Sequence, residues 1–205
     1  MTEQLELYGF GLNDRSGKVR WLCHELGIEV VERRLAYGEH RQAPYADLNP
    51  FGMIPAAVWR GQTLIESTAI CTLIAEQHPQ SGLVVAPGEP ERAAYLQWMA
   101  LFAETLESRL VEYLLAGAGV LPEAFAATTG PTLARRVPVM LGRLPEAGFL
   151  VGGRFTLADI EAAYSLRLAI NASLVELEAV AGYLRPLIAR PAALAAGFFD
   201  SLTGV

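Results

Sequence analysis

The chain has little cysteine, no excess of positive charge and no long hydrophobic run, and each lack argues against a class of protein. Its 205 residues include only two cysteines, Cys23 and Cys71, and these lack the spacing of metal ligands. We therefore expect neither a disulfide scaffold nor a zinc site, and we expect the protein to act in a reducing cytoplasm. The 16 basic and 22 acidic residues give a net charge of −6, which argues against nucleic-acid binding. Charged, Gly or Pro residues interrupt every apolar run before the roughly 18 residues of a membrane span, and the start lacks the basic segment of a signal peptide.

The chain is instead rich in apolar residues. Hydrophobic residues make up 52% of it and charged residues only 19%, which is too apolar for a disordered protein. The length allows one large domain or two small ones. Because so much apolar surface exceeds what a small monomer needs, we expect a subunit interface and hence a homodimer.

The first 80 residues alternate between strand and helix patterns. A β-type run at residues 5–10 and another at 28–35 flank an amphipathic helix, so the two strands are expected to be parallel with the helix as the crossover. This helix should end at Gly27, and its apolar positions are Val19, Leu22, Cys23 and Leu26. Two further runs, 55–59 and 63–65, read as a hairpin. Ser67 is the expected N-cap of a helix that ends before Pro79.

After residue 80 the strand patterns stop. Residues 81–90 are rich in Gly, Pro and Ser and read as a linker, which predicts an α/β domain at 1–80 and an all-helical domain at 91–205. Thr156 and Asp159 form a capping box at the start of one of its helices. Glycines and prolines leave residues 116–148 without a clear assignment.

Five short segments, at residues 7–9, 18–27, 48–55, 64–70 and 149–159, give the chain a resemblance to the glutathione transferase superfamily over nearly its whole length. The Leu-Tyr-Gly sequence at 7–9 is similar to bacterial and theta-like members of the serine type. The resemblance implies the glutathione transferase fold: a thioredoxin-like α/β N-terminal domain, an all-α C-terminal domain, and a homodimer. It says less about the reaction, since the superfamily includes transferases, isomerases, dehalogenases, peroxidases and non-catalytic proteins.

The resemblance also implies a glutathione site. The bond before Pro55 would be cis and form a turn that presents the backbone N–H and C=O of Ile54 to a peptide, as an added strand does. Alternatively, Pro55 merely begins an edge strand. At the helix that follows, Ser67 would bind the γ-glutamyl carboxylate and Glu66 the ammonium group, because the N-terminus of a helix favours an anion.

The glycine carboxylate of glutathione needs a cationic or amide partner. His40, with Arg41 beside it, occupies the position of such a residue in some family members, although an exposed His can equally be a plain surface residue. The family often has Lys or Gln where this chain has Met53, which is able to bind through its backbone but not to donate from its side chain. A lost hydrogen bond to a charged group costs about 1.5–3 kcal/mol, so glutathione affinity is expected to be weak unless His40 and Arg41 compensate.

The reaction requires a thiolate, which the loop before the first helix is expected to stabilise. The activating Ser of serine-type members aligns with Asn13, whose amide is a donor, and Ser16 offers a hydroxyl one turn later. Ser16 is alternatively the N-cap of that helix. Tyr8 is the third candidate, since tyrosine-type members use a Tyr at the end of the first strand.

These residues predict an enzyme that adds the sulfur of glutathione to a small hydrophobic electrophile, with glutathione as cosubstrate and without a metal. The acceptor pocket would include Trp98, Met99 and Phe102, which are otherwise core residues. The alternatives are a non-catalytic binding or scaffold protein of the same fold, or a glutathione-dependent peroxidase, dehalogenase or isomerase. A cysteine-based thiol–disulfide oxidoreductase is not expected, because residues 13–16 contain no cysteine.

Overall fold

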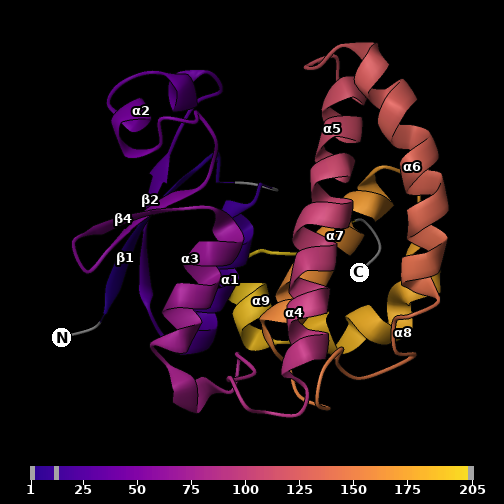
Figure 1. Ribbon diagram of the computed structural model, residues 1–205. Coiled ribbons are helices and arrows are strands. Elements are labelled where there is room, and N and C mark those ends of the chain that lie inside the picture. Colours follow the sequence, from indigo (N-terminus) through magenta and orange to yellow (C-terminus); the bar gives the residue numbers. More distant parts are fainter. Residues whose placement is uncertain (1–2, 12–13, 203–205) are drawn as a thin grey trace. The chain divides into compact units, whose positions relative to one another are not determined.

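The computed structural model describes the whole chain except residues 1–2, 12–13 and 203–205. The chain divides into two compact units, shown in Figure 1 with the sequence colours. One unit combines Met1–Val84 with Arg190–Ser201, and the other consists mainly of Val85–Ala189.

A four-stranded mixed sheet forms the centre of the first unit. Strands β1 (Gln4–Gly9), β2 (Glu29–Arg34), β3 (Ala56–Trp59) and β4 (Gln62–Ile65) lie in the order β2-β1-β3-β4. β2 runs parallel to β1, while β3 and β4 form an antiparallel hairpin beside it. This confirms the predicted β-α-β-β-β-α order and the thioredoxin-like fold of the N-terminal part.

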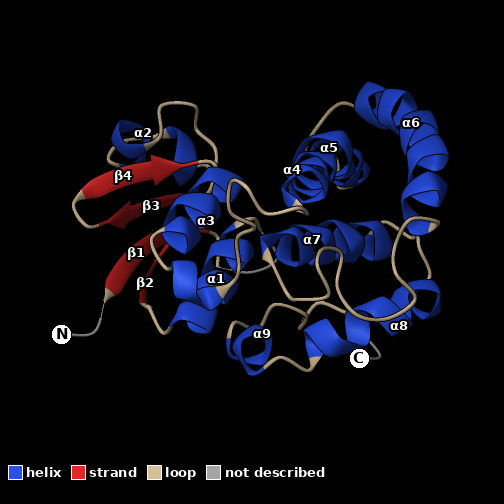
Figure 2. Ribbon diagram, turned by 60° about the horizontal axis from the view of Figure 1, so that its bottom comes forward, coloured by secondary structure: helices blue, strands red, loops and turns tan. Residues whose placement is uncertain are grey.

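Two helices cover one face of this sheet, α1 (Ser16–Leu26) and α3 (Ser67–Glu76), as Figure 2 shows. Leu5 and Leu7 alternate with Glu6 and Tyr8 along β1 and are fully buried beneath them. α1 ends at Gly27, whose left-handed φ of 69° and hydrogen bonds to the last turn close the helix.

The connection from β2 to β3 carries short helical turns, a 3₁₀ turn at Glu39–Arg41 and the helix α2 at Tyr45–Leu48. The ring of Tyr45 packs against that of Tyr8, with 6.0 Å between the centroids. Because Tyr8 points away from Leu7 and α1, this connection lies against the other face of the sheet. A second 3₁₀ turn, Pro79–Ser81, ends the α/β part.

Residues 190–201 belong to the first unit, outside the helical domain at 91–205 in which the sequence placed them. Helix α9 (Pro191–Ala195) packs against α1. The Arg190 guanidinium binds the Glu25 carboxylate through two bonds of 2.6 and 2.7 Å. The ring of Phe198 lies 4.7 Å from that of Trp21. This aromatic contact and the bidentate ion pair hold the segment to α1.

The described part of the second unit is helical, as expected. α4 (Arg92–Ala100) continues through a π-helical segment (Leu101–Glu107) into α5 (Ser108–Gly117), and α6 (Glu123–Leu141) follows. α6 lies in the region that the sequence left unassigned, with Pro131 and Pro138 inside it. α7 (Leu157–Asn171) and α8 (Leu177–Ile188) complete the unit. No helix among the described residues is long and apolar enough to cross a membrane.

Candidate functional site

Three segments of the first unit meet at one end of the sheet. Ala56, the first residue of β3, pairs with Tyr8 near the end of β1 and with Ile65 at the end of β4. The Ile54–Pro55 step before β3 therefore lies close to the residues that follow β1 and β4. This register brings the predicted turn, the start of α3 and the β1–α1 loop to the same edge.

The Ile54–Pro55 bond is cis, as the resemblance implied. Pro55 is buried, whereas Ile54 is half-buried. Among the described residues no group accepts the Ile54 N–H, so it is available to a ligand. The carbonyl of Met53 is not available, since it accepts hydrogen bonds from Tyr45 and Asn49. Of the Met53 backbone, which was expected to be able to bind glutathione, the carbonyl is thus occupied within the protein.

The N-terminus of α3 differs from the prediction in one respect. Glu66, not Ser67, is the N-cap residue, and Ser67 begins the helix. The backbone of Glu66 has a φ of 66°, a strained value for a residue with a side chain. No side chain caps this helix, and the exposed Glu66 carboxylate has no ion-pair partner in the part of the chain that the structure describes. The exposed Glu66 carboxylate thus lies beside a helix start without a side-chain cap among the described residues.

His40 is buried, 5% exposed, in contrast to a plain surface histidine. Its ring contacts Phe10 edge-on at 5.2 Å and Tyr37 at 5.3 Å. Its Nδ1 accepts the Gly38 N–H at 3.2 Å, which leaves Nε2 to carry the proton. Burial, and secondarily the positive charge of Arg41, lower the pKa of His40 and favour this neutral form.

Arg41 is brought to the loop that carries the Ile54 turn. Gly52 has a φ of 60°, and a Cβ there would lie 3.2 Å from the Arg41 Cγ. The aliphatic part of Arg41 therefore covers Gly52, two residues before Ile54. Arg41 itself is exposed, so its guanidinium is a cation close to the turn.

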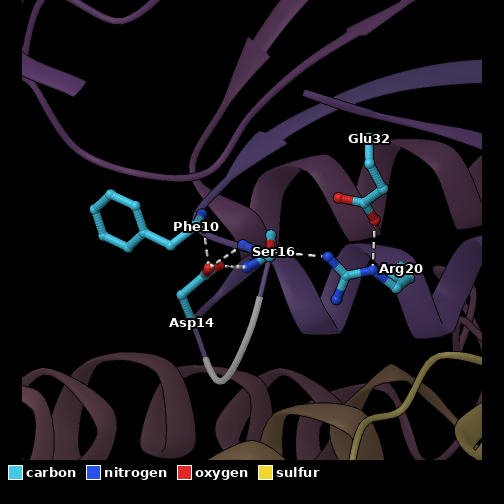
Figure 3. A network of polar contacts seen from close by, with 6 residues as sticks. Phe10, Asp14, Ser16, Arg20 and Glu32 are labelled. Carbon is cyan, nitrogen blue, oxygen red and sulfur yellow. Dashed lines mark hydrogen bonds and ion pairs between the residues drawn. The ribbon is translucent and has the colours of Figure 1, made fainter. Parts of the chain in front are cut away.

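Asp14 organises the described part of the β1–α1 loop, as Figure 3 shows. One carboxylate oxygen accepts the N–H groups of Phe10 at 2.9 Å and Gly11 at 3.1 Å, and the other accepts the Ser16 N–H at 2.6 Å. Sequence reasoning missed this role. The available signal was an Asp two residues before a helix start, a position at which its side chain often binds the backbone.

Ser16 begins α1 and is not its N-cap, which is Arg15. Its hydroxyl accepts a 3.4 Å hydrogen bond from Arg20, whose guanidinium also binds Glu32 on β2 (Figure 3). The side chain is 1% exposed and lies over Gly9, where a Cβ would come within 2.8 Å of the Ser16 Oγ. The Ser16 hydroxyl is therefore enclosed between the end of β1 and the first turn of α1.

The two other candidates for sulfur activation are Asn13 and Tyr8. Asn13 lies outside the described residues. The Tyr8 hydroxyl donates to Glu6 at 3.2 Å on the face of the sheet opposite α1, and burial raises the pKa of Tyr8, with the Glu6 hydrogen bond as a second cause. Tyr8 is thus engaged away from Ser16.

The residues expected in the acceptor pocket belong to the second unit. Phe102 is fully buried and Met99 is 6% exposed, so both form part of the core of that unit. Trp98 is half-buried, and its ring stacks on Phe102 with 5.4 Å between centroids. Of the three, Trp98 presents the most surface.

The fold and the site together define a class: a thioredoxin-like domain with an open backbone amide before a cis-proline and an uncapped helix end nearby, followed by a helical unit. Residues 15–77 match the family model for the glutathione S-transferase N-terminal domain. Glutathione S-transferase 3 of Zea mays is 32% identical over 166 residues, which span 76% of this chain and 73% of that protein. A glutathione S-transferase of Hyoscyamus muticus is 28% identical, covering 82% and 84%.

Solved structures agree with these sequence relatives. The glutathione transferase URE2P6 of Phanerochaete chrysosporium, determined with oxidized glutathione, superposes with a TM-score of 0.81 at 27% identity and covers 95% of this chain and 94% of its own. A glutathione transferase of Methylococcus capsulatus gives 0.79 at 26% identity, covering 94% and 96%. The chain belongs to the glutathione S-transferase family.

Proposed function

We propose that the protein is a glutathione transferase that adds the thiolate of glutathione to a small hydrophobic electrophile. The observation that carries the proposal is the meeting, at one end of the sheet, of the unpaired Ile54 N–H and the uncapped N-terminus of α3. A peptide with a free carboxylate suits such a site, since the amide pairs with the peptide backbone and the helix end with the anion. The choice of peptide is supported by the fungal relative URE2P6, whose structure was determined with oxidized glutathione.

Each end of glutathione has a partner in this proposal. The γ-glutamyl carboxylate binds at Ser67, and its ammonium group binds the exposed Glu66 carboxylate. The backbone of Ile54, before Pro55, pairs with the cysteinyl residue. The Nε2–H of His40 and the guanidinium of Arg41 hold the glycine carboxylate, and compensate for the donor that the Met53 side chain lacks.

The β1–α1 loop activates the sulfur in this proposal. The burial of Ser16 favours Asn13 as the group that touches the thiolate, with Ser16, Arg20 and Asp14 supporting the loop. A donor aimed at the developing charge is worth about 3–4 kcal/mol in the chemical step. Asn13→Ala should therefore lower turnover by about two to three orders of magnitude with little change in glutathione affinity.

The test is conjugation of glutathione to an activated aryl halide between pH 6 and 9, with calorimetric titration of glutathione alongside. Ser16→Ala is the matched variant in the same loop. If it causes the larger loss of turnover, Ser16 is the donor; if neither variant changes the rate or its pH profile, the loop does not activate the sulfur. Binding without any turnover would indicate the scaffold alternative.

The acceptor is proposed to be small and apolar, held in part by Trp98, which Met99 and Phe102 support from the core. We also propose that the protein acts in the cytoplasm as a homodimer. The exposed apolar side chains of Phe51 (74%) and Met53 (50%) are consistent with a subunit interface. Light scattering at micromolar concentration should give about twice the 22.2 kDa of one chain, and a mass of one chain alone would contradict the dimer.

A further inference from the structure

The carbonyl of Met53, in the turn before β3, accepts two hydrogen bonds from side chains of the protein. It accepts a hydrogen bond of 2.6 Å from the Tyr45 hydroxyl and one of 2.8 Å from the Asn49 Nδ2. Both donors are buried, each 2% exposed. Two donors from within the protein therefore use both lone pairs of one carbonyl oxygen.

Because the peptide bond is planar, this contact also fixes the direction in which the Ile54 N–H points. The Met53–Ile54 bond is trans, because cis bonds occur only at Ala43–Pro44 and Ile54–Pro55 among the described residues. In a trans peptide the C=O and the next N–H lie in one plane and point in opposite directions. Because the Met53 carbonyl is turned inward, the Ile54 N–H must point outward, where none of the described residues accepts it.

We propose that Tyr45 and Asn49 are positioning residues that hold the Met53–Ile54 peptide in the orientation required to bind the backbone of glutathione. This inference rests on the proposed function, and it assigns the alignment of the site to side chains that do not touch the ligand. Without them the peptide plane is free to rotate, and part of the glutathione binding free energy is spent on ordering it.

Both donors are themselves fixed. The Asn49 side-chain oxygen accepts the Phe51 N–H at 3.2 Å, which directs its amide nitrogen to Met53. Burial raises the pKa of Tyr45 to about 12, so its hydroxyl keeps the proton that it donates throughout the pH range of an assay. Tyr45 is further held by its ring contact with Tyr8. The orientation of the peptide is thus set before any ligand arrives.

The experiment compares Tyr45→Phe, Asn49→Ala and the double variant by calorimetric titration with glutathione and by steady-state kinetics. Each single variant should raise Kd and KM for glutathione about fivefold, and the double variant about thirtyfold or more. Turnover at saturating glutathione should stay within about twofold of wild type, because the sulfur-activating loop is untouched.

Tyr183→Phe is the matched control. It also removes a buried tyrosine hydroxyl, one that donates to Asp159 at 2.9 Å in the second unit. It should lower the thermal midpoint without changing Kd for glutathione. If Tyr45→Phe and Asn49→Ala behave in the same way, their role is merely structural and the inference is wrong.

A crystal structure of the double variant without ligand separates this inference from the proposed function. A rotated Met53–Ile54 peptide supports the positioning role, and an unchanged peptide overturns it, whatever binds there. If wild-type protein does not bind glutathione, the proposed function fails and the assignment of this peptide to glutathione fails with it.

Discussion

Two helix N-termini in this protein are built in opposite ways. At α7 the Asp159 carboxylate accepts the N–H groups of Thr156 at 2.9 Å and Leu150 at 3.0 Å, and the hydroxyl of Tyr183 at 2.9 Å. Asp159 is fully buried, so the protein itself satisfies this helix start. At α3 none of the described side chains caps the helix, and the residue before it, Glu66, is strained and exposed.

We therefore expect the start of α7 to serve stability and the start of α3 to serve ligand binding. At α7 the carboxylate of Asp159 binds the N–H groups of Thr156 and Leu150, whereas at α3 a ligand carboxylate is proposed to bind at the helix start. Either arrangement places a carboxylate at the positive end of a helix dipole, but in the described part of the chain no side chain caps the start of α3. Substitutions at the two ends should therefore affect different properties, stability at α7 and ligand affinity at α3.

The largest expected effect is that of Asp159→Ala. The change leaves two backbone N–H groups and the Tyr183 hydroxyl buried without their acceptor, which should cost about 3 kcal/mol of stability. For a chain of this size that loss lowers the thermal midpoint by about 6–12 °C. Calorimetry of the two proteins measures it. A shift of less than about 2 °C would mean that water or neighbouring groups replace the carboxylate.

Ser67→Ala should show the converse behaviour. We expect glutathione affinity to fall by about 1–2 kcal/mol, five- to thirtyfold, because a hydrogen bond to the ligand's carboxylate is lost. The thermal midpoint without ligand should hardly change, since Ser67 is not the N-cap of α3. Titration and thermal melts of the same sample test both parts, and unchanged affinity would remove the carboxylate from this helix end.

His40 provides a further test, in which the expected effect on stability is smaller and depends on pH. Its folded-state pKa is lowered, chiefly by burial, and its Nδ1 must stay unprotonated to accept the Gly38 N–H. As the pH falls below about 6.5, the unfolded state takes up more protons than the folded state, so stability declines. This decline continues down through the folded pKa and should be absent in His40→Gln.

Thermal melts of wild type and His40→Gln between pH 7.5 and 5 measure the difference, and subtraction removes the contribution of the carboxylates common to both. Identical pH dependence in the two proteins would show that the His40 ring protonates freely in the folded state.

The sequence predicted most of the fold because its signals were local. Hydrophobic period, Gly27 and the hairpin at residues 60–62 each act within a few residues, and the structure confirms the elements that they indicate. The capping box at Thr156 and Asp159 was equally local and is also confirmed. The helix α6 within residues 116–148 could not be predicted in this way, because prolines such as Pro131 and Pro138 normally interrupt helices but lie within α6.

The site was less predictable because it depends on contacts between distant segments. That Ser67 follows the cap instead of forming it depends on the backbone of Glu66, and nothing in the residue types distinguishes the two. The pairing of Tyr45 and Asn49 with the Met53 carbonyl, and of α9 with α1, likewise required the folded chain. Residue types therefore predicted the family better than they predicted which groups hold the site in place.

The smallest effect is expected for alkylation of Cys23, which lies in the core of the first unit. Cys23 is fully buried in α1, and burial raises the pKa of its thiol to about 12, with the negative charges of Glu3 and Glu32 as lesser causes. At pH 8 only about one thiol in ten thousand is then ionised. When native protein is mixed with iodoacetamide at pH 8, Cys23 should remain unmodified over an hour, because the thiolate is the reactive form and the side chain is inaccessible.

Peptide mapping by mass spectrometry gives the extent of modification at each cysteine, and the same reaction in concentrated urea is the control in which both cysteines must react. Rapid modification of Cys23 in the native protein would show that α1, and with it the base of the proposed sulfur-activating loop, opens far more readily than its burial implies.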